Sequence, residues 1–177
     1  MQFTNQNYFQ VFSLPEQFEV DGEALTRAYR GMQEQVHPDR HASGNPAERL
    51  QAVQLSSWLN EAYDTLRIPI KRAAYLLELK GIDARKVEQS ELDPGLLLEQ
   101  IRLREALEDI PRDDTGLVRL EQLRQEVEDL QAGARDRFAA ALQGPQPAEA
   151  KKHFHELQYL YKLLREITAL EEDLLGY

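Results

Sequence analysis

Two imidazoles and a carboxylate lie close together in the sequence, at His37, Asp39 and His41. An imidazole beside a carboxylate can act as a general acid–base pair, and two histidines four residues apart can ligate a metal ion. Acid–base catalysis also needs a pocket and an orienting group, and a zinc site takes a third protein ligand. The neighbouring sequence supplies neither, so we expect no catalytic residue, no metal site and no cofactor. His153 and His155 lie on different faces of a helix and cannot bind one ion together, so we interpret both as surface residues.

The proline between the first two of these residues changes the direction of the chain. Pro38 lacks an N–H and clashes with the preceding turn, so a helix that ends near Val36 cannot continue through it. It also disfavours the helical conformation at His37. A purely structural helix stop is one interpretation, but a stop requires only the proline. We favour the other, in which His37 and Asp39 face water at a hairpin tip and contact another protein.

Amphipathic segments on both sides must position this tip. The first follows Asp21, a good N-cap residue, and places Arg27 and Arg30 opposite its apolar face. The second is interrupted by Pro69, and a third short apolar run ends before Gly81, which suits a helix C-cap. The apolar positions are Leu25, Ala28, Tyr29, Met32 and Val36 in the first segment, and Ala52, Leu55, Leu59, Ala62, Tyr63 and Leu66 in the second. This spacing predicts an antiparallel helical hairpin with short flanking helices.

Glycine, aspartate and proline cluster from Gly81 to Pro94, which indicates a linker over residues 81–93. Beyond it, apolar residues recur at helical spacing in three stretches, and three such helices form a bundle. We expect these helices over residues 94–109, 115–142 and 147–175. The residues expected on the buried stripe of the third helix are Leu157, Leu160, Leu164, Ile167 and Leu174. The predicted fold class is all-α, with domains at residues 1–80 and 94–177 joined by a linker over 81–93.

The helix expected over 94–109 has apolar residues on two faces. Leu96, Leu103, Leu107 and Ile110 are enough to face the bundle. The surplus residues are Leu97, Leu98 and Ile101, and the charged residues expected around them are Glu99, Arg104 and Glu105. An apolar patch with a charged rim is typical of a protein-binding site. Two interpretations stay open: the patch binds a partner protein, or it packs against the N-terminal domain.

Composition limits the classes of function. The net charge is −10, and residues 81–177 carry most of it, with 13 Lys and Arg against 21 Asp and Glu. An acidic surface repels phosphate, so we expect no nucleic-acid partner. The longest apolar runs are shorter than the roughly 20 residues that span a bilayer, and the first ten residues lack the features of a signal peptide. Without cysteine there can be no disulfide. We expect a cytoplasmic protein with no membrane association.

The stretch from Tyr8 to Lys80 resembles a J domain, the co-chaperone module that stimulates ATP hydrolysis by heat-shock chaperones. The residues that carry this resemblance are His37-Pro38-Asp39, Tyr8-Phe9-Gln10-Val11-Phe12, Leu14-Pro15 and Asn60-Glu61-Ala62-Tyr63-Asp64-Thr65-Leu66. Over nearly the whole chain, the sequence is similar to the HscB type, the J-proteins of iron–sulfur cluster assembly. The segments that carry this narrower similarity are Ala42-Ser43-Gly44, Arg72-Ala73-Ala74-Tyr75-Leu76-Leu77, Gly81, Leu103-Arg104-Glu105 and Leu174-Leu175.

This resemblance implies two protein partners. The first is a heat-shock ATPase of the HscA or DnaK type, and the residues implied to bind it are Arg27, Arg30, His37, Pro38, Asp39 and Arg40. The second is an IscU-type iron–sulfur scaffold protein, and the residues implied to bind it are Leu97, Leu98, Ile101, Glu105 and Tyr159. Glu34 lies where many relatives have a basic residue, which implies weaker electrostatic steering toward the chaperone.

Two other functions stay open on the sequence. The chain can be a J-domain co-chaperone for a different client protein, or a helical adaptor with no link to ATP turnover. It has no glycine-rich loop of the kind that binds phosphate, so ATP chemistry is expected to belong to the partner and not to this chain.

Overall fold

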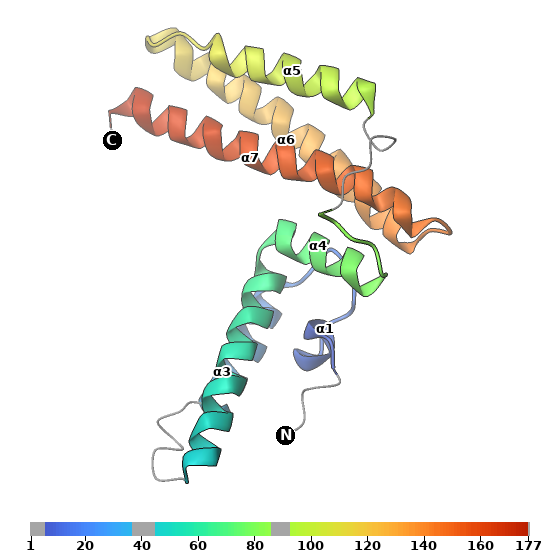
Figure 1. The fold of residues 1–177 in the computed structure, drawn as a ribbon. Helices are drawn as coiled ribbons and strands as arrows, with labels where there is room; N and C mark the ends of the chain where they lie inside the picture. Colours follow the sequence, from blue (N-terminus) through green and yellow to red (C-terminus); the bar gives the residue numbers. More distant parts are fainter. Residues whose placement is uncertain (1–5, 37–44, 86–92, 177) are drawn as a thin grey trace. The chain divides into compact units, whose positions relative to one another are not determined.

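The computed structural model describes residues 6–36, 45–85 and 93–176, and all regular structure within them is helical (Figure 1). The predicted all-α class is confirmed. The chain divides into two compact units, Met1–Leu76 and Leu77–Tyr177. The linker and the two domain boundaries predicted from composition stay a prediction.

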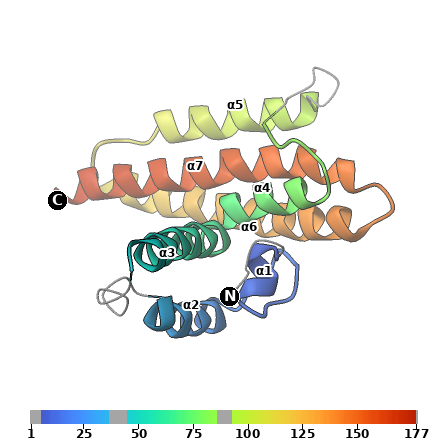
Figure 2. The same ribbon diagram turned by 60° about the horizontal axis from the view of Figure 1, so that its bottom comes forward.

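The first unit contains the expected helical hairpin, formed by α2 (Gly22–Val36) and α3 (Pro46–Arg67), which lie side by side (Figure 2). The side chain of Asp21 accepts hydrogen bonds from the backbone N–H groups of the next helix's first turn, each 2.9 Å long. These bonds lower the pKa of Asp21, as expected for a carboxylate that caps a helix. Asn45 caps α3 in a reciprocal pair with Glu48.

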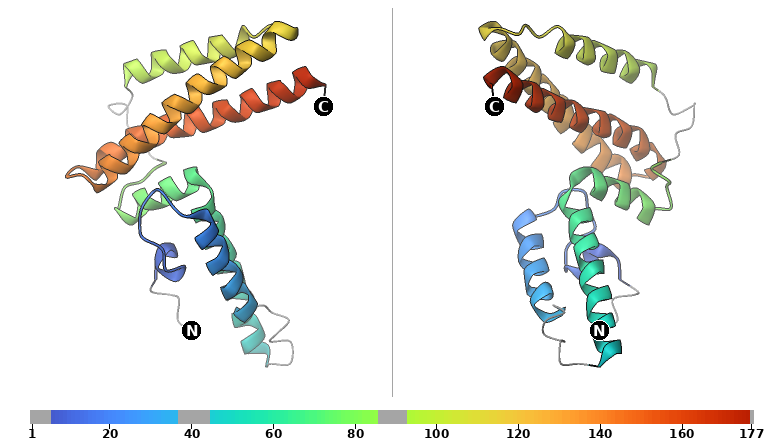
Figure 3. Two further views of the ribbon diagram at one scale, coloured as in Figure 1. Left: turned by 180° about the vertical axis from the view of Figure 1, so that it is seen from behind. Right: turned by 60° about the vertical axis from the view of Figure 1, so that its left-hand side comes forward.

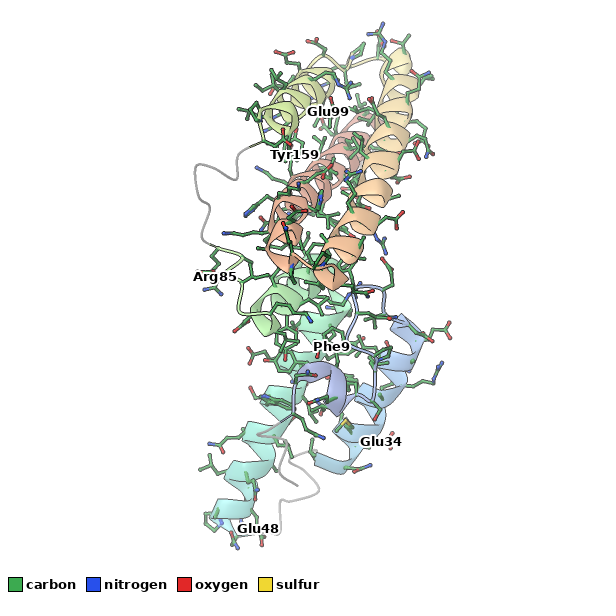
Figure 4. The ribbon with its side chains drawn as sticks, turned by 90° about the vertical axis from the view of Figure 1, so that its right-hand side faces the viewer. Phe9, Glu34, Glu48, Arg85, Glu99 and Tyr159 are labelled. Carbon is green, nitrogen blue, oxygen red and sulfur yellow. The ribbon has the colours of Figure 1, made fainter. Side chains whose placement is uncertain are left out.

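Two short helices close the hairpin, α1 (Tyr8–Val11) and α4 (Pro69–Leu79). The ring of Tyr8 stacks on that of Tyr75 with 4.4 Å between centroids, and the Tyr75 hydroxyl accepts a hydrogen bond from the Tyr8 backbone N–H. Phe9 of α1 is completely buried (Figure 4). The Tyr8 ring also meets the edge of Trp58 on α3, with 5.5 Å between centroids. Large buried side chains dominate folding energetics, so these contacts hold α1 against both α4 and the hairpin. The other large, fully buried side chains of this unit are Phe18, Leu25, Leu59, Leu66 and Leu76.

Gly81 ends α4, as predicted. Its φ of +73° is a left-handed conformation that side chains with a Cβ rarely adopt. The N–H of Gly81 donates to the carbonyl of Glu78, and the N–H of Ile82 donates to that of Leu77. This pair of bonds is the Schellman arrangement, which satisfies the last carbonyl groups of a helix.

The second unit is the expected three-helix bundle, formed by α5 (Pro94–Glu108), α6 (Asp114–Gln143) and α7 (Ala150–Leu175) (Figures 1 and 3). Its buried core includes Leu103 and Leu107 of α5, Leu120, Leu123, Val127, Ala134, Phe138 and Leu142 of α6, and Phe154, Leu157, Leu160, Leu163 and Ile167 of α7.

The third predicted helix differs from the structure in two details. Its first residues, Pro147–Glu149, form a separate 3-10 turn, η3, and the α-helix begins at Ala150. Leu163 is buried where we expected Leu164, which is only half-buried. Positions three and four residues after Leu160 both lie near the apolar stripe, so helical spacing alone does not separate them.

The turn between α5 and α6 requires a glycine at position 116. A Cβ on Gly116 would lie 2.0 Å from the carbonyl oxygen of Pro111, closer than any van der Waals contact allows. Asp113 caps α6 by accepting a hydrogen bond from the N–H of Thr115. The close approach of the two chain segments therefore determines where α6 begins.

Candidate functional site

The predicted tripeptide lies outside the described residues. His37, Pro38, Asp39 and Arg40 all belong to the stretch between the end of α2 and the start of α3. Their role in binding a chaperone stays a prediction.

The two predicted arginines of α2 are exposed. Arg27 forms an ion pair of 3.3 Å with Glu23, one turn earlier, and Arg30 makes no ion pair within the residues that the structure describes. Exposed pairs of this kind contribute little, so Arg27 can exchange its partner at small cost. Both guanidinium groups are therefore available to an acidic surface.

The opposite side of α2 is attached to α3 by aromatic and polar contacts. Tyr29 stacks on Tyr63 with 4.1 Å between ring centroids, and the Tyr29 hydroxyl donates to the side-chain carbonyl of Asn60 over 2.8 Å. The hydroxyl groups of Thr26 and Tyr63 lie 3.2 Å apart. These contacts fix the rotation of α2, which keeps its basic face directed to solvent.

The surplus apolar residues of α5 are exposed, as their spacing predicted. The exposed fractions are 55% for Leu97, 68% for Leu98 and 47% for Ile101, whereas Leu103 and Leu107 on the other face are buried. A helix with one face in the bundle core and a second apolar face in solvent offers that second face to a partner.

Leu97 and Ile101 line a groove between α5 and α7 with a volume of about 290 Å³. Tyr159 and Leu163 of α7 form its other wall, and Leu98 is not among the residues that line it. The remaining lining residues are Gln100, Arg104, Glu105, Lys162 and Glu166. The groove thus has an apolar floor and a charged rim, which is the usual anatomy of a protein-binding site.

Tyr159 joins the two walls of the groove (Figure 4). Its side chain is half-buried, and its hydroxyl donates a hydrogen bond of 2.7 Å to the backbone carbonyl oxygen of Gln100. A tyrosine is ordinarily protonated at neutral pH, and burial raises the pKa of Tyr159 further, so the phenol remains a donor. The ring is available to a partner while the hydroxyl is already occupied.

Ion pairs surround the groove. Arg104 contacts Glu166 of α7 and, at 3.3 Å, Glu108 of its own helix. Glu105 is exposed and forms no ion pair with any residue that the structure describes, so its carboxylate is free to meet a basic partner. Lys162 lies 3.7 Å from Glu166. Lys162 and Glu166 were not among the predicted site residues, although their spacing of three and seven residues from Tyr159 puts them on one helix face.

Glu99, the third charged residue expected near the patch, pairs with a neighbour and does not line the groove. It accepts two hydrogen bonds from Arg102, of 2.9 and 2.7 Å, and Arg102 also reaches Glu126 of α6. The bonds from Arg102 lower the pKa of Glu99. This cluster therefore links α5 to α6.

The two histidines of α7 correct one interpretation from the sequence, in which both are surface residues. His153 and His155 are half-buried. His153 lies 3.5 Å from Glu156, and its burial lowers its pKa. Three or more potential metal ligands do not gather anywhere in the described part of the chain. No helix within those residues is long and apolar enough to cross a membrane.

Comparison with known proteins identifies the family. The family model described as "HSCB C-terminal oligomerisation domain" matches residues 92–168. A co-chaperone protein HscB homolog of Vibrio cholerae is 36% identical over 170 residues, which cover 96% of this chain and 99% of the relative. Its counterpart in Bordetella petrii is 38% identical over 164 residues, which cover 92% of this chain and 95% of that relative. The chain belongs to the HscB family of co-chaperones.

Solved HscB structures match the whole architecture. HscB from Vibrio cholerae gives a TM-score of 0.84 at 34% identity, covering 96% of this chain and 99% of that one. Human co-chaperone HscB gives a TM-score of 0.83 at 25% identity. The match covers 94% of this chain and 83% of the human one. The HscB fold is thus confirmed over nearly the full length: an N-terminal J domain followed by a C-terminal three-helix bundle.

Proposed function

We propose that this chain stimulates the ATPase of a heat-shock chaperone of the HscA or DnaK type and delivers an IscU-type iron–sulfur scaffold protein to it. The observation that carries the proposal is the groove between α5 and α7, along which Leu97 and Ile101 are exposed and Tyr159 is half-buried. The names of the HscB relatives, which are co-chaperones, support it.

The J domain supplies the surface for the chaperone. Arg27 and Arg30 give α2 a basic solvent face, and the stretch with His37, Pro38 and Asp39 follows directly after this helix. A basic face increases the rate of encounter with an acidic surface, after which the tripeptide completes the contact. Arg40 adds a charge beside the tripeptide. The chemistry of ATP hydrolysis belongs to the chaperone, so the chain itself is not an enzyme.

The bundle supplies the surface for the scaffold. An apolar side chain of the scaffold would fill the groove beside Leu97 and Ile101, and a basic one would pair with the free carboxylate of Glu105. Leu98, the most exposed of the three apolar residues, would extend this contact beyond the groove. Burial of such a central apolar cluster provides most of the affinity of a small interface.

Both surfaces lie on one chain, and this explains how delivery works. A scaffold held by the bundle reaches the chaperone that is bound to the J domain at a high effective concentration, so a weak direct affinity between scaffold and chaperone is enough for transfer. A cytoplasmic location is part of the proposal.

The test is the ATPase rate of the purified chaperone, measured with this chain and with its His37→Gln variant. We expect the wild type to raise the rate several-fold and the variant to leave it at the basal value, with unchanged helix content by circular dichroism. Equal stimulation by both would refute the co-chaperone mechanism. If stimulation is normal but the scaffold does not bind, a different client takes the scaffold's place.

A further inference from the structure

The two halves of α5 are held to the bundle unequally. Its buried side chains, Leu103 and Leu107, both lie in the second half. In the first half Leu96 is half-buried, whereas Leu97 and Leu98 are exposed. Apolar packing stabilises a helix in proportion to the area that it buries, so it fixes the first half of α5 less firmly than the second.

One half-buried hydrogen bond reaches the middle of α5 from α7. The Tyr159 hydroxyl donates to the backbone carbonyl oxygen of Gln100, which has a second lone pair for its own helical bond. The other polar links that the structure describes between α5 and its neighbours start from Arg102 and Arg104, on partly exposed side chains. Solvent and salt weaken such ion pairs more than a shielded hydrogen bond.

We propose that the Tyr159 hydroxyl is a positioning group, which sets the spacing between α5 and α7 and keeps the groove formed before a partner arrives. This inference rests on the proposed function and gives the hydroxyl a role separate from that of the ring. The ring lines the groove beside Leu97 and Ile101, whereas the hydroxyl acts through the backbone of α5. A preformed groove loses less conformational freedom on binding than one that must assemble around its partner.

The test is Tyr159→Phe, which keeps the aromatic ring and removes only the hydroxyl. Loss of one shielded hydrogen bond predicts amide hydrogen exchange about threefold to tenfold faster in residues 97–104, with α6 unchanged. It also predicts an affinity for a purified IscU-type scaffold that is about threefold to tenfold lower. Tyr29→Phe is the matched control, since it also removes one hydroxyl hydrogen bond, from Tyr29 to Asn60 in the first unit, and it should change neither quantity.

If amide hydrogen exchange in α5 of Tyr159→Phe equals that of the wild type, the inference is overturned. It is also overturned if exchange is faster but the variant binds the scaffold as tightly as the wild type does. If the wild-type chain itself does not bind the scaffold, the proposed function fails instead. The exchange comparison, which needs no partner, then decides by itself whether the hydroxyl holds α5.

Discussion

Truncation of the groove's apolar floor tests the scaffold-binding proposal quantitatively. Leu97 and Ile101 leave 55% and 47% of their surface exposed in the free chain. Complete burial of such a side chain is worth about 1.5–3 kcal/mol, so covering the exposed half is worth about 1 kcal/mol for each residue. The double variant Leu97→Ala/Ile101→Ala should therefore lose about 1–2 kcal/mol of binding free energy, or roughly fivefold to thirtyfold in affinity.

Isothermal titration calorimetry with the purified scaffold measures this loss, and Val118→Ala is its control. Val118 lies on α6, is 61% exposed and does not line the groove, so its truncation removes exposed apolar surface without touching the proposed site. Stimulation of the chaperone ATPase should be the same for the double variant, the control and the wild type. If the double variant binds the scaffold as tightly as the wild type does, the reasoning is refuted.

The same double variant separates the two interpretations that the sequence left open. Substitution of exposed residues usually changes the free energy of unfolding by less than about 0.5 kcal/mol. If the two side chains instead pack against the N-terminal domain, truncation leaves a cavity and costs about 2–5 kcal/mol of stability. Denaturant unfolding of the variant therefore distinguishes a partner-binding surface from a contact within the chain.

Three further outcomes follow from charge, backbone and burial. Arg27→Glu with Arg30→Glu should weaken ATPase stimulation at low salt, and the difference from the wild type should shrink as salt screens the interaction. Gly116→Ala should destabilise the chain by about 1–3 kcal/mol in denaturant unfolding, because its Cβ has no space, whereas Gly133→Ala meets only a flexible side chain and should be near neutral. Burial lowers the pKa of His153 below its ordinary value of 6.5. Protonation then favours the unfolded chain, so stability should fall as pH drops below about 6.5 and His153→Gln should reduce this fall.

The helices and their ends were predictable because local chemistry determines them. Asp21 caps α2, Pro69 separates α3 from α4, and Gly81 adopts the left-handed conformation that ends α4. Each of these effects acts within one or two turns of the chain, so the sequence is sufficient to locate it. The surplus face of α5 was predictable for the same reason, since helical periodicity alone separates Leu97 from Leu103.

Contacts between helices were not predictable in the same way. The hydrogen bond from Tyr159 to the carbonyl of Gln100 joins residues that are 59 positions apart in the sequence. It depends on the distance between their two helices and on how each helix is rotated. The inclusion of Lys162 in the groove depends on the same geometry. Periodicity assigns a residue to a face but does not say which neighbour meets that face, and so the half-buried His153 was interpreted as a surface residue.

The central claim is that one molecule carries both surfaces, and a mixing experiment tests it most directly. The quantity to measure is the extra ATPase stimulation that the scaffold produces, with wild type and with an equimolar mixture of His37→Gln and Leu97→Ala/Ile101→Ala. Each variant retains one of the two surfaces intact. At a scaffold concentration near the wild-type dissociation constant, few chains in the mixture therefore hold the scaffold and the chaperone together. We predict that the wild type shows the scaffold-dependent increase and the mixture does not. An increase of equal size in the mixture would contradict the account.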